Sequence, residues 1–224
     1  MSKYTNVILA YINKKTVRYR FFHDLKNHVR ILDLGCGLGH NSIELKLLYP
    51  ALEIQGIDII DKTKVPPFII YKEYDLNNGL LPYPDNYFDA IIFCHVIEHL
   101  NKPFDLCLEI RRVLKNDGLI YVETPNWTSI LVPSFGFKRE QHDPFNFFDD
   151  PSHTKPWSKH GLFEYLSQSC DLQVIKVGTV RNWYRILLDI PIILYGLARG
   201  KRGLIINSFW NIYGWCIYGI ATKK

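Results

Sequence analysis

The chain has 224 residues, 47% of them apolar and 14% aromatic, which suffices for one folded domain with its own core. Its net charge of +5 is modest and lacks an aromatic-interleaved basic run, so it gives little support for a nucleic-acid partner; an acidic substrate or an anionic membrane surface fits it equally well. The five cysteines are odd in number and form no C-x-x-C pair, which argues against a disulfide framework or a zinc ribbon and predicts a reducing, cytoplasmic location.

The first 27 residues predict a helical cap. Basic residues such as Lys14, Lys15 and Arg18 stand among apolar ones, and no uninterrupted apolar stretch of signal-peptide type occurs. We therefore expect an amphipathic helix within 1–27 rather than an export signal, followed by the main domain over 28–224.

A glycine-rich loop follows the first apolar strand. The strand ends near Asp33, and Gly35, Gly37 and Gly39 come next at alternate positions. Glycine lets the backbone turn sharply and approach a ligand without a Cβ in the way, and the helix predicted after the loop points free N–H groups at the same spot. The spacing is G-x-G-x-G, whereas dinucleotide-binding folds have G-x-G-x-x-G, so the loop disfavours NAD.

Short apolar runs then alternate with helix-like stretches, which is typical of βαβ units and a parallel sheet. We predict strands over 29–34, 53–59, 68–72, 88–94, 118–123 and 172–180, and helices over 41–48, 103–114 and 158–169. The expected fold class is α/β, with a doubly wound sheet.

Acidic residues stand where successive strands end, and such ends meet at one edge of a parallel sheet. Asp58 closes the second strand about twenty residues beyond the glycine loop, where a carboxylate can accept both hydroxyls of a ribose. Asp75 follows the third strand. Each aspartate alone could be a helix cap and each glycine a turn residue, but their joint order favours a cofactor site.

Together these segments resemble the class I S-adenosylmethionine-dependent methyltransferases over about residues 29–180. The resemblance implies a mostly parallel seven-stranded, Rossmann-like sheet and S-adenosyl-L-methionine as cofactor. It also implies that the sheet ends in an antiparallel hairpin, with 215–224 as the last strand and 172–180 as the other. It assigns the cofactor site to residues of four strand ends: Asp33, Gly35, Gly37 and Gly39; Asp58 and Ile59 at the ribose; Asp75 at the adenine amino group with Leu76 packed on the ring; and Cys94 and His95 at the methionine end.

The segment from His95 to Leu100 resembles the V-I-E-H-L stretch of small-molecule and glycan methyltransferases. If it turns helical, His95, Glu98 and His99 share one face. The resemblance implies that His99 lies at the substrate pocket and acts as general base, a role that an imidazole pKa of about 6.5 suits. We place Glu98 in the catalytic group with it. His153, in a segment that resembles the family's D-x-x-H lid motif, is the second candidate base.

A metal site is the main alternative at this cluster. Some relatives with an E-x-x-E-H segment and a distal histidine hold a divalent ion, and two histidines with a carboxylate could bind one here. We expect no metal, because this chain has His95 where those relatives carry a carboxylate. A structural role for the histidines is less favoured where several converge on one pocket. No role is assigned to His23, His28, His142 and His160.

Two further segments need an explanation. Residues 126–157 lack either periodicity and are rich in Pro, Phe, Asp and His, which predicts an ordered lid. Residues 183–212 are unusually apolar and predict a helical insertion before the last strand. Polar residues disfavour a membrane span over 203–222. An interfacial anchor or a lid over a lipid-like acceptor is weighted equally with core or dimer burial.

The sequence therefore predicts a cytoplasmic transferase that methylates an oxygen of a glycan, lipid-linked or quinone-like small molecule. Peripheral contact with the inner face of the membrane through 183–212 stays open beside burial of that segment, and no nucleic-acid partner is expected. The alternatives are a non-catalytic cofactor-binding or membrane-associated accessory protein and, less favoured, an NAD-dependent oxidoreductase. The acceptor and the oligomeric state are left open.

Overall fold

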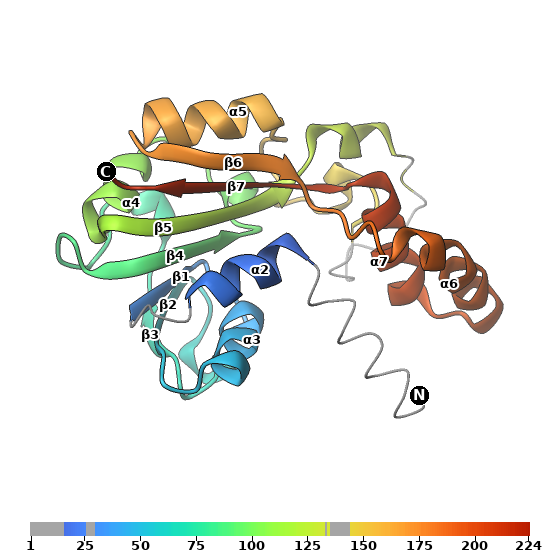
Figure 1. The fold of residues 1–224 in the computed structure, drawn as a ribbon, viewed down its shortest axis with the longest axis horizontal. Coiled ribbons are helices and arrows are strands. Elements are labelled where there is room, and N and C mark those ends of the chain that lie inside the picture. The colour runs from blue at the N-terminus through green and yellow to red at the C-terminus, as the bar shows by residue number, and fades with distance from the viewer. Residues whose placement is uncertain (1–15, 26–29, 133, 135–143) are drawn as a thin grey trace.

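The computed structural model describes residues 16–25, 30–132, 134 and 144–224. Its centre is a seven-stranded sheet with the order β3-β2-β1-β4-β5-β7-β6 (Figure 1). The strands are β1 (Arg30–Leu34), β2 (Glu53–Asp58), β3 (Ile70–Glu73), β4 (Phe88–Cys94), β5 (Leu114–Pro125), β6 (Gln173–Thr179) and β7 (Cys216–Thr222). Strands β1 to β5 are parallel, and β7 runs antiparallel between β5 and β6. The predicted mostly parallel α/β sheet is confirmed.

Helices cover both faces of this sheet. They are α2 (Val17–Asp24) and α3 (His40–Leu48) on one face, and α4 (Cys107–Val113) and α5 (Lys159–Glu164) on the other. Two more helices, α6 (Ile186–Arg199) and α7 (Arg202–Tyr213), follow β6. Short 3₁₀ turns occupy Lys62–Lys64, Leu76–Asn78, Ile97–His99, Trp127–Leu131 and Phe147–Asp149, and a π turn, Tyr165–Ser169, extends α5.

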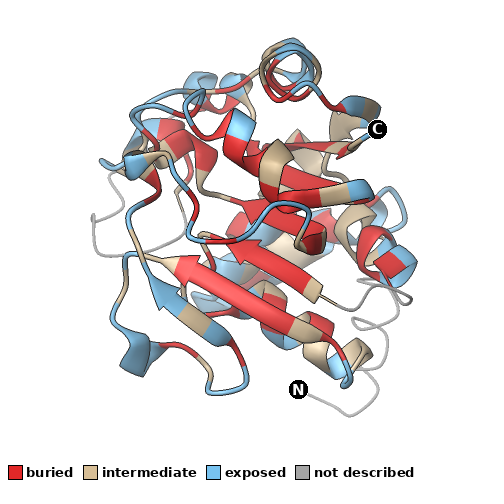
Figure 2. Ribbon diagram, turned by 90° about the vertical axis from the view of Figure 1, so that its left-hand side faces the viewer, coloured by how far each residue is buried: buried red, intermediate tan, exposed pale blue. Residues whose placement is uncertain are grey.

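Alternate strand residues build two hydrophobic clusters, one on each face, as the two-residue period of a strand requires. In β1, Leu32 and Leu34 join the cluster under α4 and α5, whereas Ile31 joins the cluster under α2 and α3. Figure 2 shows the central strands as buried, with β3 largely exposed at the edge.

Two predicted boundaries are wrong. The helix expected from residue 103 begins only at Cys107, because residues 103–106 form a turn first. Strand β5 begins at Leu114 rather than at 118, since Leu114 already pairs with Phe88. The pairing of β5 with β4 is irregular after Leu114, where Asp117 has a left-handed φ of 60°.

Three predicted segments surround this core. The cap over 1–27 is described only from residue 16 to 25, where α2 buries Phe21 and Phe22, and the rest of that prediction lies outside the described residues. Within 126–157, residues 133 and 135–143 also lie outside, while Phe147 and Trp157 are buried. Between β6 and β7 the chain forms α6 and α7, which lie beyond the end of the sheet (Figure 1).

None of the described helices combines the length and the apolar character that crossing a bilayer takes.

Candidate functional site

A first cavity of about 280 Å³ opens where the loops after β1, β2, β3 and β4 meet. This is the carboxyl edge of the parallel strands, where ligands bind in open α/β sheets. The lining residues are Gly35, Gly37, Asp58, Ile59, Tyr74, Asp75, Leu76, Asn77, His95, Val96, His99 and Leu100. Most of the predicted site residues are thus brought together from four separate segments.

The two glycines of the cavity wall serve different purposes. Gly35 and Gly37 have left-handed φ angles of 75° and 49°. A Cβ at Gly35 would lie 2.2 Å from Cγ2 of Val96, so glycine lets the loop after β4 cross directly over the loop after β1. A Cβ at Gly37 would meet no atom within 4 Å. The backbone at Gly37 is therefore open to close approach by a ligand.

Asp58 is held at the cavity wall by backbone donors. The N–H of Gly37 donates to its Oδ2 at 2.7 Å, and the N–H of Ile59 donates to its Oδ1 at 2.7 Å. A carboxylate has about four lone-pair sites on its two oxygens, so a fixed Asp58 can still accept hydroxyl protons from a ligand.

Asp75 and Leu76 form the opposite wall. The Oδ1 of Asp75 accepts from the backbone and side-chain nitrogens of Asn77 at 2.9 and 3.0 Å, which caps the 3₁₀ turn Leu76–Asn78. Asp75 therefore caps the turn and also lines the cavity, so its interpretation as a cap is compatible with its interpretation as a cofactor-site residue. Leu76 is 5% exposed and offers an apolar surface beside it.

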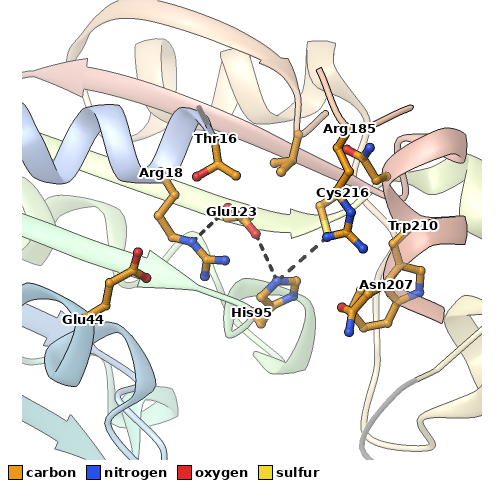
Figure 3. A pocket seen from close by; sticks show the side chains of 11 residues that line it. Thr16, Arg18, Glu44, His95, Glu123, Arg185, Asn207, Trp210 and Cys216 are labelled. Atoms are coloured by element: carbon orange, nitrogen blue, oxygen red, sulfur yellow. Dashed lines mark hydrogen bonds and ion pairs between the residues drawn. The ribbon is translucent and has the colours of Figure 1, made fainter. Parts of the chain in front are cut away.

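A second cavity of about 290 Å³ lies on the other side of His95 (Figure 3). Helices α2, α3 and α7 and the ends of β5 and β7 supply much of its wall, which consists of Thr16, Arg18, Glu44, His95, Glu123, Val180, Arg185, Asn207, Trp210, Asn211 and Cys216. His95 is common to the linings of both cavities.

His95 is fixed between two buried carboxylates. Its backbone is left-handed, with a φ of 56°; Nδ1 lies 3.4 Å from Oε1 of Glu98, and Nε2 lies 3.3 Å from Oε1 of Glu123. Burial lowers the pKa of a histidine, but the neighbouring Cys216 and the two carboxylates outweigh it and raise the pKa of His95 well above its ordinary value. The two carboxylates therefore favour the protonated, cationic form of His95.

Glu123 completes this charged network. Burial opposes its ionisation, but Arg18 and His95 hold its pKa at about 2. Nε of Arg18 lies 4.0 Å from its Oε2, and the Tyr121 hydroxyl donates to the same oxygen at 2.5 Å. The sequence analysis does not assign Glu123 to the site, although Glu123 ends the predicted fifth strand and so stands at the same edge of the sheet as Asp58. Arg18 could not be found by that argument, because it comes from α2.

His99 is oriented by two residues of the 126–157 segment. Its Nδ1 lies 2.9 Å from the Ser152 hydroxyl oxygen, and that hydroxyl donates its proton to Oδ1 of Asp150 at 2.5 Å. A hydroxyl has only one proton, so at the other contact the oxygen accepts from the Nδ1–H of His99. In the neutral ring this leaves the lone pair on Nε2 of His99, a residue of the first cavity.

His153 approaches His99 from the same segment, with the two ring centroids 4.8 Å apart. Its Nδ1–H donates to the Phe147 carbonyl at 2.6 Å, so its lone pair is also on Nε2. Burial is the main cause that lowers the pKa of His153, so it favours the neutral ring. His153 does not line either cavity.

Two groups of side chains in the described part of the chain could hold a metal ion, with ligand atoms within 4.8 Å of one another. One is Glu98, His99 and His153. The other is His95, Glu123 and Cys216, where the Arg18 guanidinium already neutralises the carboxylate and disfavours a second cation. The first group therefore fits a metal better.

Four more of the predicted residues do not line the first cavity: Asp33, Gly39, Cys94 and Glu98. Asp33 is 1% exposed and its Oδ2 accepts from the Ser42 hydroxyl at 2.6 Å, so it ties β1 to α3 from within. Gly39 stands at the N-terminus of α3. The Glu98 carboxylate turns inward, where the Thr124 hydroxyl donates to its Oε2 at 3.0 Å.

Comparison with known proteins agrees with this geometry. Residues 32–122 match the sequence profile of a family described as "Methyltransferase domain". Ajmaline N-methyltransferase of Rauvolfia serpentina is 23% identical over 83% of this chain and 65% of its own length. Trans-aconitate 2-methyltransferase of Escherichia coli O1:K1 is 27% identical over 67% of this chain and 60% of its own. The chain spans between about half and two thirds of the length of the curated relatives it matches.

Solved structures share the fold. A SAM-dependent methyltransferase from Archaeoglobus fulgidus superposes with a TM-score of 0.62 and 21% identity, covering 97% of this chain and 99% of its own. The [4+2]-cyclase SpnF superposes with a TM-score of 0.58 and 20% identity, covering 91% and 80%.

Proposed function

We propose that the chain is a class I S-adenosylmethionine-dependent methyltransferase that transfers a methyl group to a hydroxyl oxygen of a small-molecule acceptor. The methyltransferase-domain match over residues 32–122, the methyltransferase relatives and the shared fold support this proposal. The observation that carries the proposal is that His95 lines both cavities, so a donor in the first and an acceptor in the second would meet at one side chain. Direct transfer requires this adjacency, because the reacting atoms have to be held in line and close together.

The first cavity fits the nucleoside part of the cofactor. Asp58 offers fixed oxygens for ribose hydroxyls, Gly37 leaves its backbone open to close approach, and Asp75 and Leu76 offer an acceptor and an apolar surface for the adenine. When bound, S-adenosylmethionine supplies a methyl group on a positively charged sulfur. An oxygen nucleophile then needs a base nearby to take its proton.

His99 is the proposed base. The lone pair on its Nε2 can accept the acceptor's proton, and the resulting imidazolium is stabilised through Nδ1–H, Ser152 and Asp150. His95 suits this role less well, because Glu98 and Glu123 favour its protonated form. We assign His95 to positioning instead, as the fixed wall past which the acceptor hydroxyl reaches His99.

The acceptor class follows from the second cavity. Thr16, Asn207 and Arg185 offer hydrogen-bonding groups, and the Trp210 ring offers an apolar face. A few polar groups around an aromatic surface suit a polyhydroxylated or amphiphilic molecule. We propose a glycan, lipid-linked or quinone-like acceptor on this basis. The relatives do not narrow the choice, since their names specify a nitrogen in one case and a sterol carbon in another.

The test is turnover of a His99→Ala variant. We expect formation of S-adenosylhomocysteine with hydroxyl acceptors to fall by about 10²- to 10⁴-fold, the usual worth of a general base, with cofactor affinity unchanged. A matched control is His160→Ala, whose side chain is 81% exposed on α5 and pairs with Glu164, and which is expected to keep full turnover. Full turnover in His99→Ala would remove His99 from this role.

A metal-assisted version of the reaction is the second candidate, since Glu98, His99 and His153 place their ligand atoms within 4.8 Å. If it operates, a chelator would abolish turnover and a divalent ion would restore it, and elemental analysis would find one bound ion. Turnover that is insensitive to chelation supports base catalysis by His99.

A non-catalytic or differently catalytic role is the remaining alternative. SpnF, named as a cyclase, has this fold, so the fold alone does not establish methyl transfer. Cofactor binding without methyl transfer to any hydroxyl acceptor would favour that alternative.

A further inference from the structure

Helix α6 has an apolar surface on its outward side. Its inward side carries Asp189 and Gly196, both buried, with the Gly196 backbone close to Ile205 of α7. A helix that is apolar all round is ordinarily buried, in a core or in lipid. The exposed apolar and aromatic residues, which lie on the remaining half of the helix at 100° per residue, are Leu187, Leu188, Ile190, Pro191, Leu194, Tyr195, Leu197 and Ala198.

The charges around this surface have one sign. The turn between α6 and α7 carries Arg199, Lys201 and Arg202, and no Asp or Glu occurs from residue 190 to 224. The acid of α6, Asp189, is fully buried and accepts from Arg185 Nε at 2.8 Å and from Asn211 Nδ2 at 2.5 Å. The α6–α7 hairpin, residues 183–213, therefore offers apolar and cationic groups and no exposed carboxylate.

Aromatic residues mark the start of the hairpin. Trp183 and Tyr184 are 69% and 68% exposed, and the Arg181 guanidinium lies 5.0 Å from the centroid of the Trp183 ring. Tryptophan and tyrosine favour the boundary between lipid headgroups and acyl chains, because they combine an apolar ring with a polar edge.

We propose that the α6–α7 hairpin docks on the surface of an anionic lipid bilayer, with the outward side of α6 among the headgroups and the Arg199–Arg202 turn against lipid phosphates. Interfacial helices bind in this way, through buried apolar area and attraction of basic residues to anionic lipid. The charge pattern favours lipid over a second copy of this chain, which would bring no carboxylate from the same hairpin to the cationic turn.

Docking also has a consequence for the second cavity. Arg185, just before α6, and Asn207, Trp210 and Asn211 on α7 line that cavity from the same hairpin. A docked hairpin would hold the cavity next to the lipid surface, where a lipid-linked acceptor is presented. This consequence rests on the proposed function, whereas the docking itself does not.

The test is co-sedimentation of the full chain with vesicles, without cofactor or acceptor. We expect binding to phosphatidylcholine vesicles that contain phosphatidylglycerol, weaker binding to phosphatidylcholine alone, and loss of the difference in high salt. An Arg199→Glu/Lys201→Glu variant should bind the anionic vesicles at least tenfold more weakly, since one basic residue near such a surface contributes about fivefold. The matched control is Lys62→Glu/Lys64→Glu, on the exposed turn after β2, which should bind as the unchanged chain does.

Apolar variants give an independent readout. Leu187→Ser/Leu194→Ser removes side chains that are 85% and 62% exposed, so it should fold normally and lose vesicle binding. Its control is Leu47→Ser/Leu108→Ser, at sites that are 80% and 68% exposed on α3 and α4, which should leave binding unchanged.

Three results would overturn the docking proposal. The first is equal sedimentation of all variants with anionic vesicles, and the second is no sedimentation of the unchanged chain with those vesicles. The third is a dimer that the substitutions Leu187→Ser/Leu194→Ser dissociate in the absence of lipid, which would show that a second copy covers α6. Methyl transfer to a soluble acceptor is measured separately, so failure of docking and failure of the proposed function are distinguishable.

Discussion

At the scale of single residues, Asp58 is a carboxylate that the backbone holds in place. The N–H groups of Gly37 and Ile59 fix one oxygen each, so little reorganisation is needed when hydroxyl donors arrive.

We predict that Asp58→Asn lowers the affinity for S-adenosylhomocysteine by about 10- to 100-fold. The amide loses the charge that makes such hydrogen bonds strong, a difference of about 1.5–3 kcal/mol. Calorimetric titration measures the change. Asp61→Asn is the control, because the Asp61 carboxylate is exposed nearby and accepts from the backbone N–H and the hydroxyl of Thr63. Equal affinities in the two variants would contradict the assignment.

Asp33 is a buried carboxyl whose charge opposes folding. Burial raises its pKa to about 6 from 3.8, against the hydrogen bond from Ser42. A group with a raised folded-state pKa holds its proton more tightly when folded, so it contributes stability that is fully present below about pH 4 and lost as the pH rises through 6.

We therefore predict that Asp33→Asn, which keeps an oxygen for Ser42, raises the free energy of unfolding at pH 8 by up to roughly 3 kcal/mol and changes it little at pH 4. Urea unfolding of both proteins across this range provides the comparison. The idea fails if the difference between the two proteins does not change with pH.

At the scale of elements, the loop after β4 shows what a sequence pattern can and cannot predict. Helical spacing placed His95, Glu98 and His99 together, and a 3₁₀ turn over Ile97–His99 does so. The spacing does not predict that the Glu98 side chain turns inward to Thr124 while the His99 side chain turns toward Ser152. The backbone at His95 is left-handed, and the side chain of His95 contacts Glu123 of another strand. The local spacing of residues cannot reveal either feature.

The crossing of the loops after β1 and β4 depends on Gly35. We predict that Gly35→Ala lowers the free energy of unfolding by about 2–4 kcal/mol, because left-handed strain adds to a clash with Val96. Adding Val96→Ala should recover part of this loss. Gly37→Ala should cost only about 1 kcal/mol, from strain alone, while its Cβ enters the cavity and weakens cofactor binding. Chemical unfolding and calorimetry separate the two effects, and equal destabilisation by both alanines would contradict this account.

At the scale of the whole molecule, the sheet and the cofactor edge were predictable for a physical reason. Strand period and glycine spacing are local signals, and the carboxyl ends of parallel strands meet at one edge, so Asp58 and Asp75 could be placed beside Gly37 from the sequence alone. The second cavity could not be predicted. It joins Arg18 of α2, Glu123 of β5 and Cys216 of β7, residues that are far apart in sequence and share no motif.

The same division separates the two halves of the proposed reaction. The methyltransferase profile covers residues 32–122 and so most of the first cavity, whereas α2 and α7, which line the second cavity that we propose for the acceptor, lie outside it. The acceptor therefore has to be identified from this chain's own side chains.

Calorimetric titration of the unaltered chain with S-adenosylhomocysteine and with NAD tests the central claim most directly, because it asks which cofactor the cavity beside Gly37 accepts. We expect saturable one-site binding of S-adenosylhomocysteine and no heat with NAD. Binding of NAD, or no binding of the S-adenosyl compound, would contradict it.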